Sequence, residues 1–205
     1  MTDNVLKYEK RRVRTMQIFS TIITNVLTAL YQPFWFAIIL SVLFMFVYKS
    51  YPSIKQAVTD WISWFKTDSA FRRTFLLVFY TAMILFRTLL NRNMWANPLS
   101  DVIGVWWLYN AKGELTTECI ENFALFIPFT VLLLWAAKER ILARVTIGSV
   151  LWKSLKITFL FSFGIEMLQL LLRLGTWQLS DLFYNTLGGA VGGLIYYVGY
   201  KVKHR

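Results

Sequence analysis

The 205-residue chain contains only one histidine and one cysteine, so it has few of the side chains that most often bind metals or form disulfide bonds. His204 lies in a basic C-terminal tail, which leaves a His-based catalytic triad and most zinc sites without candidate residues. Cys119 has no partner for an internal disulfide bond, and we interpret it as a packing residue. We therefore expect neither a metal nor another cofactor.

Charged residues are also scarce, at 16% of the sequence, whereas a soluble domain carries about 25%. Hydrophobic residues make up 57% of the chain and aromatic residues 18%, which is the composition of a membrane protein. The net charge is +11, but the basic residues lie between apolar segments, as topology determinants do. A nucleic-acid-binding protein would instead carry them on one face of a soluble fold, so we expect no nucleic-acid partner.

Five apolar segments have the pattern of membrane helices, which need about 20 mostly apolar residues. They are 33–48, 74–91, 118–137, 154–174 and 181–200. The sequence thus predicts an all-α fold, a polytopic membrane helical bundle over 33–205. A basic N-terminus and an amphipathic helix over 15–31 form a separate region, 1–32, because Gln32-Pro33 ends that helix.

The basic residues between these segments predict the orientation of the bundle. The segments 49–73, 138–153 and 201–205 carry five, four and three Lys or Arg residues. The connections 92–117 and 175–180 carry two and none. Because basic loops stay in the cytoplasm, we expect these two connections outside the cell membrane and the C-terminus inside.

The N-terminal region leaves three arrangements open, because 1–14 carries five basic residues although five spans would put it outside. Residues 15–48 could form a hairpin that adds a sixth crossing, or a re-entrant pair, or the N-terminus could depart from the charge rule. We favour the hairpin. Two further expectations are a short amphipathic surface helix over 57–65 and a connection, 92–117, that folds back over the bundle.

Polar side chains gather in the outer half of the predicted bundle. Ionisable groups cost roughly 2.5–3.5 kcal/mol each near the centre of a membrane helix, so their presence there favours a functional role. Glu166, Gln169 and Arg173 share one helix face, at positions i, i+3 and i+7. The predicted ligand-binding set comprises Arg87, Glu121, Asn122, Glu166, Gln169, Arg173, Asp181 and Asn185.

The last predicted span combines polar residues with glycines on one face. Asp181 and Asn185 are followed at helical spacing by Gly188 and Gly192. This pattern allows a neighbouring helix to approach closely, and packing alone explains the glycines. An internal ion-pair network is the structural explanation for the charged residues, since arginines could neutralise the carboxylates. Such buried pairs need not stabilise a fold, so we favour a functional role.

These residues lie in segments that resemble the VanZ-like family of bacterial membrane proteins. The matching segments are LFRTLLN at 85–91, NPLSDVIGVW at 97–106, GELTTECIENFALFIPF at 113–129 and FGIEMLQLLLRLGTWQLSDLFYNTLGG at 163–189. The resemblance implies low-level resistance to glycopeptide antibiotics with a lipid tail, above all teicoplanin, and it implies no settled enzymatic activity. Thr130 departs from the pattern, because a glycine often follows the F-x-P-F element.

Three functions therefore remain open. A non-enzymatic resistance protein would use the polar set to bind a lipid-tailed glycopeptide or its lipid-linked cell-wall target, and the resemblance favours this function. A membrane enzyme acting on a lipid-linked head group would use Glu166 or Asp181 as general acid or base, with arginines holding a phosphate. A transporter of a lipid-linked cell-envelope precursor would need more spans or a homo-oligomer. Membrane lipids are partners in every case.

Overall fold

The computed structural model describes residues 2–48, 54–110 and 113–204, and within these ranges every regular element is a helix. In chain order the elements are α1 (Thr2–Tyr31), α2 (Phe34–Tyr48), α3 (Ile54–Thr67), α4 (Ser69–Leu85), the π-helical turn η1 (Phe86–Leu90), α5 (Glu118–Ile141), α6 (Ile147–Leu172) and α7 (Leu179–Lys203). The all-α prediction is confirmed. The basic residues Lys49, Lys112 and Arg205, which entered the charge comparison, lie outside the described residues.

Three of the described helices are long and apolar enough to cross a membrane: Ser69–Leu90, α5 and α6. α2 is apolar but has only 15 residues. α7 has 25 residues, but its glycines, tyrosines and Asn185 make it less apolar than the other three. Five predicted segments are therefore helical, whereas three of them meet the length and composition of a span by themselves.

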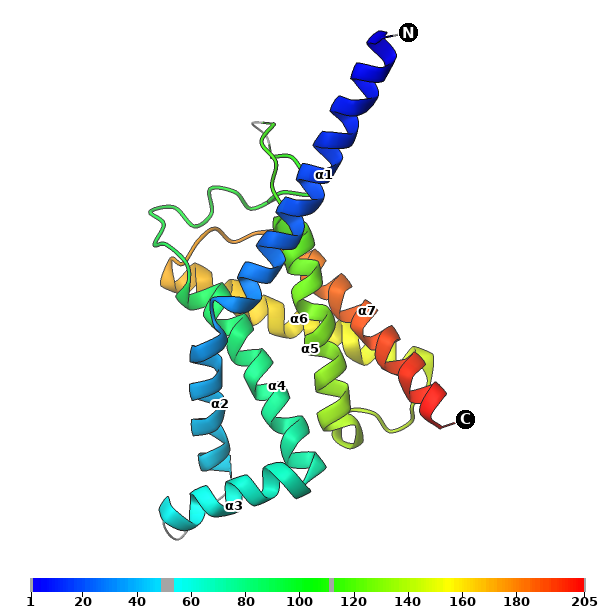
Figure 1. The fold of residues 1–205 in the computed structure, drawn as a ribbon. Helices are drawn as coiled ribbons and strands as arrows, with labels where there is room; N and C mark the ends of the chain where they lie inside the picture. Colours follow the sequence, from blue (N-terminus) through cyan, green and yellow to red (C-terminus); the bar gives the residue numbers. More distant parts are fainter. Residues whose placement is uncertain (1, 49–53, 111–112, 205) are drawn as a thin grey trace.

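The N-terminal helix is longer than predicted and differs in direction. α1 runs without a break from Thr2 to Tyr31, and a turn at Gln32 and Pro33 separates it from α2. α1 extends away from the bundle instead of folding back along α2, and it contacts the beginning of α5 (Figure 1). The expected hairpin over 15–48 is therefore wrong. Hydrogen bonds from α1 to the connection that precedes α5 hold this direction.

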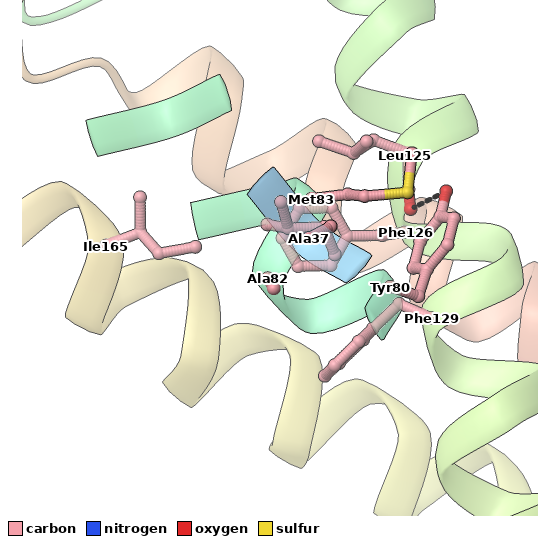
Figure 2. Packing of buried hydrophobic residues seen from close by; sticks show 9 residues of the cluster. Ala37, Tyr80, Ala82, Met83, Leu125, Phe126, Phe129 and Ile165 are labelled. Atoms are coloured by element: carbon pink, nitrogen blue, oxygen red, sulfur yellow. Dashed lines mark hydrogen bonds between the residues drawn. The ribbon is translucent and has the colours of Figure 1, made fainter. Parts of the chain in front are cut away.

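The apolar core lies between α2, α4, α5 and α6 (Figure 2). Its buried residues are Ala37, Tyr80, Ala82, Met83, Ile84, Leu125, Phe126, Phe129 and Ile165. The hydroxyl group of Tyr80 donates a hydrogen bond of 3.0 Å to the carbonyl oxygen of Leu125, as Figure 2 shows. The bond satisfies the polar end of a buried aromatic ring and fixes α4 against α5.

α7 packs closely against both α5 and α6, and its glycines make this possible. A Cβ atom at Gly188 would overlap the carbonyl oxygen of Phe123 on α5, and one at Gly189 would overlap the Thr158 side chain on α6. Gly192 and Gly193 repeat the two contacts one turn later. The predicted role of the glycines in close helix packing is thus confirmed.

The connection between η1 and α5 folds back over one end of the bundle, as predicted. Backbone N–H groups of Trp95, Trp177 and Leu179 donate hydrogen bonds of 2.9 Å that join this connection to the turn between α6 and α7. Both connections lie at the same end, opposite α3 (Figure 1). We call this end the loop end and the opposite one the basic end. The predicted amphipathic helix over 57–65 is confirmed as part of α3.

Candidate functional site

A polar cavity of about 430 Å³ lies at the loop end, between η1, α5 and the beginning of α7. Its lining residues are Asn25, Arg87, Asn91, Arg92, Leu115, Thr116, Thr117, Glu118, Glu121, Asn122 and Asp181. Two guanidinium groups and three carboxyl groups therefore share one small space. Four of the eight residues predicted from the sequence line it, namely Arg87, Glu121, Asn122 and Asp181.

An ion pair between Arg87 and Glu121 forms one wall of the cavity. Within the described residues it is the sole ion pair, and its side chains are 21% and 11% exposed. Glu121 also accepts a hydrogen bond from the hydroxyl group of Thr117, which itself accepts one of 2.7 Å from the amide of Asn25. This network connects α1, α5 and η1, so it positions the wall as well as balancing the charge.

Arg87 lies on the π-helical turn η1, where the chain leaves the α-helical hydrogen-bond pattern. The N–H group of Asn91 donates to the carbonyl oxygen of Phe86, five residues earlier, at 2.8 Å. The amide of Gln169 on α6 donates a hydrogen bond of 2.7 Å to the carbonyl oxygen of Thr88. Single π-helical turns often occur at functional sites. Gln169 is buried and satisfies a carbonyl group of this turn, but it does not line the cavity.

Asp181 lies in the first turn of α7 and forms the wall of the cavity opposite the ion pair. Its carboxyl group lies near the side chain of Asn122. Arg92 and Arg87 interact favourably with it, and Glu118 interacts unfavourably. Its place in the first turn also puts its negative charge where the dipole of α7 favours an anion. The cavity thus carries a carboxylate held between an amide and two cationic side chains.

Glu166 lies beneath the cavity and faces Asp181. Along the contact between α6 and α7, Asn185 meets Ser162, Gly189 meets Thr158 and Gly193 meets Ser154. One further step of four residues brings Glu166 opposite Asp181, and the two carboxyl groups interact electrostatically.

The carboxyl group of Glu166 has one protein donor in the described part of the chain. It is 2% exposed, and Oε2 accepts a hydrogen bond of 3.1 Å from the N–H group of Gln178. The Gln178 side chain donates in turn to Asp101 at 3.1 Å. Glu166 therefore connects the interior of α6 to both folded-back connections.

The remaining two predicted residues have different surroundings. The amide of Asn185 donates a hydrogen bond of 2.9 Å to Ser162, while Oδ1 of Asn185 is buried without a partner among the described residues. Arg173 ends α6 in the left-handed conformation, with φ of 55°, and its side chain is exposed away from the cavity. Its carbonyl oxygen accepts the hydrogen bond from Trp95. The ligand-binding role of both residues stays a prediction.

Four cavity residues with charged or amide side chains were absent from the predicted set: Asn25, Asn91, Arg92 and Glu118. Arg92 follows Arg87 by five residues, and in an α-helix this spacing places two residues on different faces. The π-helical turn changes the relative direction of the two side chains. Nothing in the sequence pattern marks that turn. Asn25 lies within the predicted amphipathic helix over 15–31, and its contact with Thr117 depends on the direction of α1.

The arrangement suits recognition of a polar group better than metal chemistry. Among the described residues no group of three or more His, Cys, Asp or Glu side chains is close enough to hold a metal ion. The two guanidinium groups can bind the oxygens of a phosphate or carboxylate, and the three carboxylates can accept hydrogen bonds from hydroxyl, amide or ammonium groups. Such a mixed set matches a head group that carries both anionic and donor groups.

A helical chain with three apolar helices of spanning length is a membrane protein. The family model described as VanZ/LLP1 matches residues 34–200, from the beginning of α2 almost to the end of α7. The chain belongs to this family, as the resemblance of its motifs implied. The match includes every charged residue of the cavity and leaves α1 outside. No curated protein and no solved structure matches the chain.

Proposed function

We propose that this protein crosses a bacterial cell membrane several times, with its loop end outside and its C-terminus in the cytoplasm. The proposal is supported by the charge balance of the connections, because the segments 49–73, 138–153 and 201–205 carry most of the basic residues. The cavity would then open at the outer surface, at the level of the lipid head groups. A ligand could enter it from water or from the outer leaflet.

The protein's role is low-level resistance to lipid-tailed glycopeptide antibiotics such as teicoplanin. The cavity would bind the polar part of the drug or of its lipid-linked cell-wall target, while the lipid tail stays in the bilayer. The observation that carries this function is a cavity at the loop end with both guanidinium and carboxylate groups. In the proposed orientation it would lie where the polar and apolar parts of such a molecule separate. Its lining residues come from α1, η1, α5 and α7, so ligand binding would also hold those four elements together.

A second function is a membrane enzyme or transporter that acts on a lipid-linked cell-envelope precursor. One observation favours it: Glu166 and Asp181 face each other, and Arg92 lies near both carboxyl groups. Two carboxyl groups in different surroundings can divide the roles of general acid and general base. The arginines would then hold a phosphate during turnover.

Susceptibility testing of a Gram-positive host separates these functions. The host expresses the wild type, Asp181→Asn or the control Asp60→Asn, and growth is measured with teicoplanin and with vancomycin. Asp181→Asn removes the charge but keeps the shape of the side chain, whereas Asp60 lies on α3 at the basic end. We expect the wild type and Asp60→Asn to protect against teicoplanin alone, and Asp181→Asn to lose protection at equal membrane level.

Failure of the wild type to protect would refute the resistance role. The enzyme or transporter would then be tested with a labelled lipid-linked precursor in vesicles, where head-group release or movement across the bilayer replaces growth as the readout. The orientation is tested separately, by fusing a fluorescent protein or alkaline phosphatase to the C-terminus. A fluorescent fusion and an inactive phosphatase are expected, and the reverse result would overturn the orientation.

A further inference from the structure

Two grooves at the basic end share one set of residues. The first has a volume of about 450 Å³ between the ends of α2 and α5 and the beginning of α4, and the second, of about 420 Å³, lies between the ends of α5 and α7. Both are lined by Arg73, Trp135 and Lys138, which therefore form the ridge between them. The ends of α2, α5 and α7 that line them lie at the basic end (Figure 1), whereas the polar cavity lies at the loop end.

The ridge presents two cationic groups in fixed positions. The guanidinium group of Arg73 donates hydrogen bonds to the carbonyl oxygens of Ser69, at 3.1 Å, and Trp135, at 3.3 Å, and to the Ser69 hydroxyl group, at 3.3 Å. A guanidinium group has five N–H donors, so these bonds leave donors for a ligand. The ammonium group of Lys138 lies 5.4 Å from the ring centre of Tyr200.

α5 is kinked close to the residue that accepts a hydrogen bond from Arg73. Ala137 has non-helical dihedral angles, φ of −123° and ψ of 18°, and it kinks the helix near its end. The carbonyl oxygen of Trp135 accepts from Arg73 just before this kink. The kink thus changes the direction of the last turn of α5, which carries Lys138 and Arg140.

The charges around the ridge favour an anionic ligand. Neither Arg73 nor Lys138 forms an ion pair with a described carboxylate, and Glu139 is the acidic residue that lines the first groove. Arg140 lines the first groove, and Lys203 and His204 line the second. Below the ridge the walls are apolar, with Leu77 and Val78 in one groove and Val131 and Ile195 in the other.

We propose that the ridge and its two grooves bind an anionic phospholipid. The phosphate lies against Arg73 and Lys138, and the acyl chains lie along the two apolar grooves. Basic pockets between membrane helices at the cytoplasmic side recognise lipid head groups in this way, and Trp135 and Tyr200 have the aromatic character of the membrane interface. The ligand is bound at the end of the bundle away from the cavity, so the inference rests on the proposed orientation and not on the proposed resistance function.

Native mass spectrometry of the full chain tests this site. The protein in detergent is incubated with dioleoyl phosphatidylglycerol or dioleoyl phosphatidylcholine, and bound lipid is counted. The test variant is Arg73→Gln/Lys138→Gln, and the matched control, Arg144→Gln/Lys156→Gln, removes two exposed basic residues from the same half of the molecule. We expect phosphatidylglycerol to bind the wild type and the control equally. The test variant should bind it more weakly, on the order of tenfold for each charge-assisted hydrogen bond that the substitutions remove.

A second variant keeps all charges and fills a groove. Gly199 lines the second groove, and nothing lies within 4 Å of a Cβ atom there, so Gly199→Phe can occupy the groove while the protein still folds. Reduced phosphatidylglycerol binding by this variant supports the site. Equal binding of phosphatidylcholine, wild-type binding by both test variants, or displacement of the lipid by equimolar glycerol 3-phosphate would overturn it, the last because the site would then recognise a soluble phosphate.

Discussion

Replacing Glu166 separates the charge of this residue from its role as a hydrogen-bond acceptor. Glu166→Gln keeps an oxygen that can accept from the N–H group of Gln178, now 3.1 Å away, and removes the ability of this side chain to ionise opposite Asp181. Glu166→Leu has a similar size but leaves that N–H group without an acceptor. The two variants therefore differ mainly in one hydrogen bond.

The expected free-energy differences follow from this hydrogen bond. A buried N–H group left without a partner costs about 1–3 kcal/mol, and Glu166 is 2% exposed, so water cannot replace it easily. Glu166→Leu should lower the free energy of unfolding by that amount. Glu166→Gln should stay within about 1 kcal/mol of the wild type. Removing the ionisable group relieves the cost of burying its charge and the repulsion from Asp181, which offsets the loss of attraction to Arg92.

Unfolding in mixed micelles with an increasing fraction of denaturing detergent measures both values. The control is Glu139→Gln, which removes a charge at an exposed position near the end of α5, at the basic end of the bundle. If Glu166→Gln is as unstable as Glu166→Leu, the charge itself holds the fold and the acceptor argument is refuted. If Glu166→Gln is stable but no longer protects against teicoplanin, the charge of Glu166 serves the function.

Two further predictions concern helix packing and the ion pair. Gly188→Ala should destabilise the protein by about 1–3 kcal/mol in the same unfolding assay, because the new methyl group overlaps the carbonyl oxygen of Phe123. The control Gly199→Ala should be neutral or slightly stabilising, because nothing lies within 4 Å of a Cβ atom there. Equal effects of the two substitutions would contradict the close contact at Gly188. A double-mutant cycle with Arg87→Gln and Glu121→Gln should give a coupling energy of about 0.5–3 kcal/mol, reduced by the partial exposure of both side chains, and additive effects would show that the ion pair contributes nothing.

The sequence predicts much of the fold because most of its helices are apolar runs separated by polar or basic segments. The apolar runs locate α2, α4, α5, α6 and α7, although α5 continues to Ile141 and α6 begins at Ile147, beyond the predicted ends. The ends of membrane helices carry charged and polar residues, so a segment defined by its apolar residues is shorter than the helix. The direction of α1 could not be predicted, because it depends on single contacts such as that of Asn25 with Thr117.

The candidate site, too, could be predicted from the sequence only in part. Arg87, Glu121, Asn122 and Asp181 could be grouped because each lies near the same end of its predicted helix. Arg92 could not, because its place depends on the π-helical turn, which has no sequence signal of its own. Gln169 and Arg173 share a helix face in an unbroken α-helix, but α6 ends at Leu172 and the left-handed conformation of Arg173 turns its side chain away.

The small residues of α7 determine which polar groups meet. On one face Gly188 and Gly192 contact the backbone of α5, and on the other Gly189 and Gly193 contact Thr158 and Ser154 of α6. These contacts allow one register on each neighbour, since a shift would bring larger side chains against the backbone.

With that register, Asp181 lies two turns before the glycines, about 10 Å along the axis, where it meets Asn122 on one side and Glu166 on the other. The contacts that hold α7 in place therefore also assemble the cavity. A substitution such as Gly188→Ala should for this reason disturb the cavity even where the helices remain folded.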